Sequence, residues 1–262
     1  MLHIQLVSPA GASRALTVAS RAVIVGATSA VGEALAASYA RDGWALTVVA
    51  RDPAALASVA SNLRLRYGCD VLELHFDAGD PATAEAAGRA CLAAGAPDVV
   101  IYAVGCNAAD GAVEDPTEIA LVHSVNFGSA AAFTAPLLRH LGGRRDAALA
   151  FISSVAGDRG RKANFIYGSA KAALNAYAQG LRALLHPAGV SVTTVKLGYV
   201  DSRMSFGLAP LALTISAERA ARCIRTAVER RREVVYVPGF WRAIMTVIRA
   251  IPEGIFKRLP LP

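Results

Sequence analysis

From residue 21 onward, short apolar runs rich in β-branched residues alternate with longer stretches whose apolar residues recur at helical spacing. The runs predict strands at Ala22–Val25, Ala45–Ala50, Val71–Phe76, Val99–Ala103, Ala148–Ser153, Val190–Leu197 and Glu233–Val237. The longer stretches predict helices at about Ala30–Arg41, Pro53–Tyr67, Pro81–Ala94, Pro116–Leu141, Asn164–Leu185 and Ala217–Arg231. This alternation predicts an α/β fold, a doubly wound Rossmann sheet of seven parallel strands with helices on both faces.

The pattern contains no internal repeat and no low-complexity linker, so one Rossmann domain over residues 21–238 is expected. Residues 239–262 are interpreted as an amphipathic, basic segment of the same domain, and residues 1–20 as an N-terminal extension. That extension lacks the apolar core of a signal peptide. Nowhere do eighteen apolar residues follow one another, so we expect no membrane-spanning helix and a cytoplasmic protein.

Composition narrows the classes of partner. The hydrophobic fraction of 54% comes largely from alanine and valine, which suits a parallel sheet covered on both faces. The net charge of +7 favours anionic ligands or surfaces, but the arginines are scattered and no aromatic RNA-binding signature accompanies them. We therefore expect no nucleic acid partner. The four cysteines are isolated and no metal-ligand spacing occurs, so neither a metal site nor a disulfide framework is predicted.

A glycine turn follows the first predicted strand. It reads Gly26, Ala27, Thr28, Ser29, Ala30, Val31, Gly32 and then continues as a helix. Gly26 permits a tight turn, and Gly32 allows the helix and strand backbones to approach closely. The amino terminus of such a helix offers backbone N–H groups to a pyrophosphate. In the first βα unit of a repeated βα pattern, this turn predicts a dinucleotide site.

The end of the second strand bears on the choice of cofactor. Arg51 follows Ala50, where a carboxylate would otherwise bind the adenosine ribose hydroxyls. An arginine there pairs with a 2′-phosphate, which favours NADP(H) over NAD(H), although Asp52 complicates this choice and Arg51 also fits a solvated surface position. Asp77, after the third strand, has two interpretations: a hydrogen-bond acceptor for the adenine amino group, or a cap for the helix at Pro81.

A serine, a tyrosine and a lysine form the predicted reaction centre. Ser154 follows the fifth strand, and Tyr167 and Lys171 lie four residues apart on one helix face. Reduction of a ketone needs a proton for the oxygen, and a free tyrosine with a pKa of ~10 releases one slowly at neutral pH. We expect the Lys171 ammonium, together with the positive charge of the oxidised nicotinamide, to lower the pKa of Tyr167. The Ser154 hydroxyl is expected to hold the substrate oxygen.

Asn126 lies inside the long helix that precedes the fifth strand. Its side chain can open a helical turn and hold a water in a proton relay to Lys171, or it can be an ordinary interior asparagine.

Together these motifs resemble those of the short-chain dehydrogenase/reductase family over nearly the whole chain. The resemblance implies that Tyr167 is the catalytic acid/base, that Ser154 orients the carbonyl, that Lys171 binds the nicotinamide ribose, and that Asn126 completes the relay. The predicted cofactor site comprises Gly26, Thr28, Ser29, Ala30, Val31, Gly32, Arg51, Asp77, Ala103, Gly105, Tyr167, Lys171, Val200 and Ser202.

Three positions depart from the family pattern. Ala30 replaces the middle glycine of the turn. Tyr102-Ala103-Val104-Gly105 replaces the usual Asn-Asn-Ala-Gly after the fourth strand, so that loop is expected to be steadied differently. Leu197-Gly198 replaces Pro-Gly after the sixth strand, where the resemblance puts Val200 against the nicotinamide carboxamide and Ser202 in place of a threonine.

The chain end after the last strand is amphipathic. On a helix, Phe240, Ile244, Val247 and Ile251 share one face, which Trp241, Met245 and Ile248 flank. With the basic residues nearby, this segment suits peripheral contact with an anionic bilayer at the inner face of the plasma membrane. The alternative is that it packs on its own domain or across a dimer interface.

The last 110 residues or so, from Arg159 on, further resemble the reductase components of decaprenylphosphoryl-ribose 2′-epimerases. Such enzymes reduce a 2-keto polyprenyl-phosphoryl pentofuranose, so the resemblance implies a lipid-linked keto-sugar in cell-wall or lipid-linked sugar biosynthesis as substrate. Arg159, Arg161 and Lys162 are then candidates for the lipid phosphate, or simply surface charge.

Two other functions remain open. One is reduction of a lipid ketone of the 3-ketosphingoid or 3-oxoacyl type. This substrate predicts an apolar tunnel around Tyr199, Asp201 and Arg203, where the sugar predicts a polar site. The other is a catalytically silent cofactor-binding membrane module, against which the intact Ser154, Tyr167 and Lys171 argue. The family resemblance also implies a homo-oligomer, joined through the helices around Asn126 and Tyr167.

Overall fold

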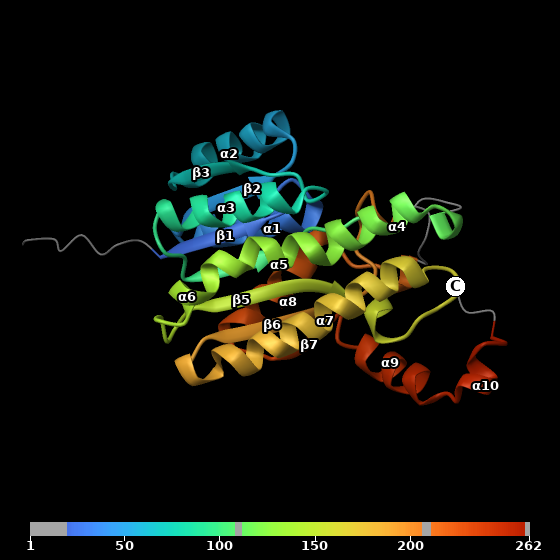
Figure 1. The fold of residues 1–262 in the computed structure, drawn as a ribbon. Coiled ribbons are helices and arrows are strands. Elements are labelled where there is room, and N and C mark those ends of the chain that lie inside the picture. The colour runs from blue at the N-terminus through green and yellow to red at the C-terminus, as the bar shows by residue number, and fades with distance from the viewer. Residues whose placement is uncertain (1–19, 108–111, 206–210, 260–262) are drawn as a thin grey trace, which may run out of the picture.

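The computed structural model describes residues 20–107, 112–205 and 211–259 (Figure 1). The predicted N-terminal extension therefore lies, apart from Ser20, outside the described residues. The described part forms one seven-stranded sheet in the order β3-β2-β1-β4-β5-β6-β7, and every pairing is parallel. The predicted doubly wound Rossmann sheet is confirmed.

The strands begin and end within two residues of the predicted positions. They are β1 Arg21–Val25, β2 Ala45–Ala50, β3 Val71–His75, β4 Val99–Tyr102, β5 Ala148–Ser154, β6 Ser191–Leu197 and β7 Val234–Val237. The central strands β1, β2, β4 and β5 are buried along most of their length, as expected for apolar runs covered on both faces.

Two layers of helices cover the sheet (Figure 1). One apolar core lies under α1 Ala30–Arg41, α2 Pro53–Tyr67 and α8 Ala217–Glu229. The other lies under α3 Pro81–Ala93, α5 Ser129–Thr134 and α7 Phe165–Leu185. The switch between β1 and β4, where successive crossovers run to opposite sides, opens the carboxyl edge of the sheet for a ligand.

Asp-Pro pairs begin three of the helices. Asp52, Asp80 and Asp115 each accept a hydrogen bond from a backbone N–H of the first turn, and each is followed by a proline that needs no such bond. Asp80, and not Asp77, therefore caps α3, so the interpretation of Asp77 as that cap is wrong.

The predicted helix Pro116–Leu141 is not one regular helix. It divides into α4 Pro116–His123, a π-helical turn Ser124–Gly128, α5, a 3-10 turn Ala135–Leu137 and α6 Leu138–Leu141. In the described part of the chain, this is the stretch whose length and composition alone would let it cross a membrane. Its buried polar residues Asn126, Ser129 and Thr134 and its packing on α3 instead fit a core helix of an α/β domain.

The C-terminal segment, residues 239–259, forms α9 Trp241–Ala250 and the short α10 Glu253–Phe256 beside the carboxyl edge of the sheet (Figure 1). Trp241 and Met245 are buried against Val155, with Ile244 and Ile248 partly buried around them. The residues that pack on the domain, Trp241, Met245 and Ile248, are thus those that flank the apolar face in the helical pattern. Phe240 and Val247, which belong to that apolar face, are exposed.

Candidate active site

The turn after β1 has the geometry of a phosphate-binding loop. Gly26 adopts φ +87°, and a Cβ there would lie 2.7 Å from the carbonyl oxygen of Ala103. A Cβ at Gly32 would lie 2.1 Å from the carbonyl oxygen of Gly26, so neither position accepts a side chain. Ser29 caps α1, because its Oγ accepts from the N–H of Gly32 at 3.1 Å.

The first residues of α1 are open to a ligand. Ser29 and Ala30 are exposed and Thr28 is half-buried, whereas Val31 points into the core. Because Ala30 is exposed, its methyl group, which replaces a glycine, displaces no neighbouring core atom. The dinucleotide fits this cradle, since two glycines keep side chains out of it and a twelve-residue helix starts beside it.

The adenosine end lies after β2 and β3. Arg51 is exposed at the tip of β2. Both hydrogen bonds from the first turn of α2 go to Asp52 Oδ1, so this carboxylate is engaged as a helix cap. Asp77 lies just after the end of β3, the strand next to β2. Its Oδ1 accepts a hydrogen bond from the N–H of Gly79 at 2.9 Å. Asp52 is thus a helix cap, and Arg51 is exposed beside it, so the choice between NADP(H) and NAD(H) stays a prediction.

Ser154 and Tyr167 meet at the carboxyl edge of the sheet. Ser154 is the last residue of β5, and its Oγ accepts from the N–H of Ala156 at 3.1 Å. Tyr167 lies in the first turn of α7 and is hydrogen-bonded to Ser154. The predicted pair is therefore brought together by a strand end and a helix start.

The charge state of the pair differs from the expectation. Burial raises the pKa of Tyr167 to about 12, although the hydrogen bond with Ser154 works in the opposite direction. Burial also lowers the pKa of Lys171 to about 8. Lys171 alone therefore does not lower the pKa of Tyr167, and the part of the expectation that depends on the nicotinamide charge stays a prediction. The phenol is instead held protonated, which is the form that an acid for ketone reduction must have.

Lys171 and Asn126 lie behind the tyrosine. Lys171 is buried, with its Nζ 5.7 Å from the centre of the Tyr167 ring, and it donates to the carbonyl oxygens of Ile152 and Val104 at 3.2 and 3.3 Å. A Cβ at Gly105 would lie 3.1 Å from Nζ. The loop after β4 thus borders Lys171 at Val104 and the predicted Gly105, whereas the predicted Ala103 lies against Gly26.

Asn126 lies in the π-helical turn, so the predicted opening of the helix is present. Its Nδ2 donates to the carbonyl oxygens of Val122 and Cys106 at 2.9 and 2.8 Å. Its Oδ1 accepts from the N–H of Cys106 at 3.3 Å. The water relay to Lys171 stays a prediction, because these contacts involve protein atoms alone.

The departure at Tyr102 has a structural explanation. Its hydroxyl lies 2.6 Å from the Oγ of Ser129, which itself donates to the carbonyl oxygen of Val125. Tyr102 is therefore the donor to Ser129, and its ring packs near Phe133 and Phe151. The loop after β4 is held to α5 by this buried phenol, as the departure from Asn predicted.

The loop after β6 carries the last predicted cofactor contacts. Val200 is buried and paired with Ile215, so only its backbone is suited to a nicotinamide carboxamide. Ser202 is half-buried, and its Oγ lies 3.1 Å from that of Ser205. A Cβ at Gly198 would lie 2.0 Å from the indole nitrogen of Trp241, so the glycine provides the space in which α9 begins.

Sequence reasoning missed several side chains around the site. Cys106 lies beside Asn126, with a distance of 3.6 Å from Nδ2 to the sulfur, and Asp158 forms a buried ion pair with Lys196. The position of Cys106 directly after the Gly105 motif was a usable signal. The ion pair had none, because its partners are 38 residues apart.

Arg159 was interpreted as a candidate for the lipid phosphate, and this prediction is wrong. Its guanidinium donates to the carbonyl oxygens of Ile248 and Ile251 at 2.6 and 2.5 Å, and it pairs with Glu253 at 2.9 Å. It also stacks 3.7 Å from the centre of the Phe256 ring. Arg159 therefore anchors the C-terminal segment. Arg161 is half-buried and Lys162 exposed, and their proposed role is untested.

These features define a class of protein, the Rossmann oxidoreductases with a Ser-Tyr-Lys centre. The sequence pattern of the short chain dehydrogenases matches residues 20–210. An uncharacterised oxidoreductase of Streptomyces coelicolor is 35% identical over 240 residues, covering 90% of this chain and 94% of that protein. An uncharacterised oxidoreductase of Mycobacterium tuberculosis is 32% identical over 251 residues, covering 93% of this chain and 98% of that protein.

Solved structures share the fold. A short-chain dehydrogenase from Sphingobium yanoikuyae in complex with NADPH aligns with a TM-score of 0.77 at 23% identity, over 89% of this chain and 97% of that one. L-Sorbose reductase from Gluconobacter frateurii, complexed with NADPH and L-sorbose, aligns with a TM-score of 0.76 at 20% identity, over 84% of this chain and 95% of that one.

The chain belongs to the short-chain dehydrogenase/reductase family, and it is an NAD(P)-dependent oxidoreductase acting on CH–OH groups. The names of the Streptomyces and Mycobacterium relatives specify no substrate. The narrower resemblance to reductases of polyprenyl-phosphate sugars is therefore a proposal.

Proposed function

We propose that the protein is an NADPH-dependent reductase that converts a ketone to a secondary alcohol on a polyprenyl-phosphate-linked keto-sugar. The observation that carries this proposal is the protonated Tyr167, hydrogen-bonded to Ser154 at the open edge of the sheet. A protonated phenol at this position can donate a proton to a ketone oxygen as the ketone is reduced.

The chemistry divides between the cofactor and the chain. NADPH supplies a hydride for the carbonyl carbon. Ser154 orients the carbonyl oxygen, and Tyr167 donates its hydroxyl proton to that oxygen as the C–H bond forms. Lys171, close behind the ring, favours the resulting phenolate when it is protonated, and Asn126 holds the loop that borders it.

The preference for NADPH rests on Arg51. It is exposed at the tip of β2, while the neighbouring carboxylate of Asp52 is engaged as the cap of α2. The guanidinium of Arg51 can donate a charge-assisted hydrogen bond to a 2′-phosphate. The Sphingobium dehydrogenase and L-sorbose reductase, which share the fold, are both complexed with NADPH.

A polar substrate group suits the loop after β6. Asp201 and Arg203 are exposed there. Burial raises the pKa of Glu33, and the nearby charge of Arg203 acts in the opposite direction. This polar surface supports a sugar over the apolar tunnel that a lipid ketone would need. L-Sorbose reductase, whose structure contains L-sorbose, is an example of an enzyme with this fold that binds a sugar.

The C-terminal segment supports contact with a bilayer. Phe240, Val247, Ile255 and Leu259 keep between 39% and 66% of their surface exposed. Residues 239–259 hold four basic residues, Arg242, Arg249, Lys257 and Arg258, and a single acidic one, Glu253, which pairs with Arg159. Exposed apolar and cationic side chains together favour an anionic surface, such as the inner face of the plasma membrane.

A spectrophotometric screen tests the reaction. Oxidation of NADPH and of NADH is followed with a polyprenyl-phosphoryl 2-keto-pentofuranose, with a long-chain 3-ketone and with short soluble ketones. We expect turnover of the keto-sugar lipid with NADPH. Turnover of the long-chain ketone alone would favour the second enzyme function, and turnover of short ketones alone would contradict a lipid-linked substrate. Nicotinamide oxidation that persists in Tyr167→Phe would overturn the site assignment.

Vesicle sedimentation tests the surface separately. We expect Phe240→Asp and Val247→Asp to abolish binding to phosphatidylglycerol vesicles. Leu65→Asp is the matched control, because Leu65 is 87% exposed on α2, which packs beside β3 at the other end of the strand order from β7 and α9. Equal binding of all variants would contradict the proposal. Point variants are preferable to deletion of residues 239–262, which would remove Trp241 and Met245 and expose the Val155 side chain that they cover.

We also propose a homo-oligomer joined through α4, α5 and α7. Leu121 on α4 and Phe165 and Leu184 on α7 are exposed apolar side chains on these helices. We expect Leu184→Asp to shift the mass measured by light scattering toward the monomer, and an unchanged mass would contradict this interface.

A further inference from the structure

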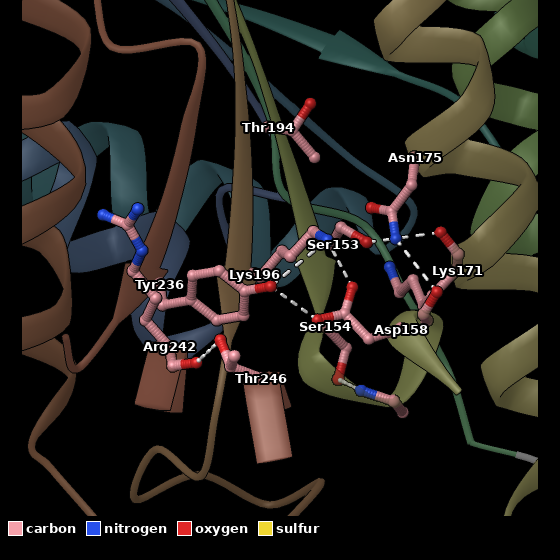
Figure 2. Close-up of polar contacts among 12 residues, drawn as sticks. Ser153, Ser154, Asp158, Lys171, Asn175, Thr194, Lys196, Tyr236, Arg242 and Thr246 are labelled. Atoms are coloured by element: carbon pink, nitrogen blue, oxygen red, sulfur yellow. Dashed lines mark hydrogen bonds and ion pairs between the residues drawn. The ribbon is translucent and has the colours of Figure 1, made fainter. Parts of the chain in front are cut away.

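A buried ion pair lies beside the turn that carries Ser154, apart from the groups used above. The Asp158 side chain is 2% exposed and that of Lys196 is 14% exposed. Lys196 Nζ forms an ion pair with Asp158 Oδ1, and the hydroxyl of Tyr236 donates to Oδ2 at 2.7 Å (Figure 2). Donors from β6 and β7 thus hold both oxygens of the carboxylate.

This carboxylate fixes the far end of the turn that begins at Ser154. The turn is the 3-10 segment η4 Val155–Asp158, for which Ser154 is the cap. Its near end is held by the hydrogen bond from Ala156 N–H to Ser154 Oγ. In the sheet register, Ser153 pairs with Lys196 and Lys196 with Tyr236, so the donors lie one row before Ser154. Asp158 therefore ties the turn back to the sheet beside the reaction centre.

The same turn contacts the helix of Tyr167 and Lys171. Asn175 on α7 donates to the carbonyl oxygen of Gly157 at 3.2 Å. A Cβ at Gly157 would lie 2.8 Å from the carbonyl carbon of Lys171, so turn and helix touch along their backbones. Movement of the turn would therefore change the distance between the hydroxyl groups of Ser154 and Tyr167.

Net stability alone is a poor explanation for this cluster. A buried ion pair gains little over apolar residues of similar size, because both charges lose their hydration. Its contacts do define orientation, since each carboxylate oxygen has its own donor from a separate strand.

We propose that Asp158 is a positioning residue for Ser154, acting through the ion pair with Lys196 and the hydrogen bond from Tyr236 to place the Ser154 hydroxyl beside Tyr167. The catalytic consequence rests on the proposed ketone reduction, whereas the placement itself is measurable without it.

The first experiment compares Asp158→Asn with Asp98→Asn. Asp98 forms an ion pair with Arg144 at the amino edge of the sheet, far from Ser154 along the strands, and it is the matched control. With NADPH and the ketone that the wild type turns over fastest, we expect Asp158→Asn to lower kcat by about 10- to 100-fold and to change KM less than about threefold. Asp98→Asn is expected to lower the melting temperature at unchanged kcat, and Lys196→Arg to retain most of kcat.

The second experiment reads the hydroxyl position directly. The amide of Ala156 is protected by Ser154 Oγ, so hydrogen exchange at this amide reports where the hydroxyl lies. We expect faster exchange in Asp158→Asn and no change in Asp98→Asn. Should Asp158→Asn fail to fold because Lys196 is left unpaired, the double variant Asp158→Asn/Lys196→Met removes both charges and takes its place.

The outcomes separate the two proposals. Unchanged kcat and unchanged Ala156 exchange, with only a lower melting temperature, would reduce Asp158 to a structural residue and overturn the inference. If the wild type reduces no ketone, the proposed function fails, and faster Ala156 exchange in Asp158→Asn still supports the placement of Ser154.

Discussion

The turn after β1 and the C-terminal segment border the same edge of the sheet, yet different contacts hold them. The turn depends on backbone: Gly26 N–H donates to the carbonyl oxygen of Val49 at 2.8 Å, and Gly32 has no room for a Cβ. The C-terminal segment depends on long side chains, chiefly Arg159 on the end of α9 and Trp241 on Gly198.

The difference separates two requirements of a reductase. A pyrophosphate is the same in every reaction, and fixed backbone N–H groups recognise it without any particular side chain. The substrate end must differ between enzymes, and side-chain contacts can be exchanged without rebuilding the sheet. In this protein backbone contacts hold the turn after β1 and side-chain contacts hold the C-terminal segment, so we expect the C-terminal segment to tolerate more substitutions.

The largest effect is expected where the two regions meet, at the reaction centre. Tyr167→Phe should lower kcat by roughly 10²- to 10⁴-fold, because the ring remains while the proton donor is lost. NADPH affinity by fluorescence titration and the melting temperature should stay near the wild-type values. A variant that loses cofactor binding in parallel with turnover would show that the hydroxyl serves binding, not proton transfer.

The second largest effect is expected on the free energy of unfolding, with no change in cofactor binding. Trp241→Ala removes a buried indole from the cluster with Met245 and Val155, and we expect the free energy of unfolding in urea to fall by about 3–5 kcal/mol. Because the cofactor turn has its own backbone contacts, NADPH affinity should be retained in the folded variant. Weaker NADPH binding at low denaturant would contradict the division between the two regions.

At the cofactor end, Arg51→Ala should raise KM for NADPH by about tenfold or more and leave KM for NADH nearly unchanged. Arg222→Ala is a suitable control, because Arg222 is exposed on α8 and its substitution also removes one positive charge. Initial rates with each cofactor measure the effect. Equal increases for both cofactors would mean that Arg51 does not discriminate the 2′-phosphate.

The smallest effect concerns pH. Burial lowers the pKa of Lys171 to about 8, so its ammonium is present below this pH and is lost as the pH rises through it. The pKa of Tyr167, about 12, keeps the phenol protonated over the same range. We expect kcat/KM for reduction to fall above pH ~8, by at most about tenfold per pH unit, and the fall to move to higher pH in Lys171→Arg. A profile flat to pH 10 would contradict this assignment.

The contrast also explains what the sequence could predict. The Gly26–Gly32 turn, the strand limits and the Tyr167–Lys171 spacing depend on neighbouring residues, so local patterns predicted them. The packed face of α9 could not be predicted because the apolar face and the residues that flank it both fit a helix, and only the position of Val155 and Gly198 selects one. Asp158 and Tyr236 are 78 residues apart, and no local pattern indicates such a pairing.

The close contact of Gly198 with Trp241 has a consequence for engineering this protein. The two positions share one volume, so introducing a larger residue at 198 requires a smaller one at 241 in the same clone. Libraries that randomise them separately would reject most members at both sites, whereas a paired library would sample alternative shapes for the wall between the last strand and the catalytic turn.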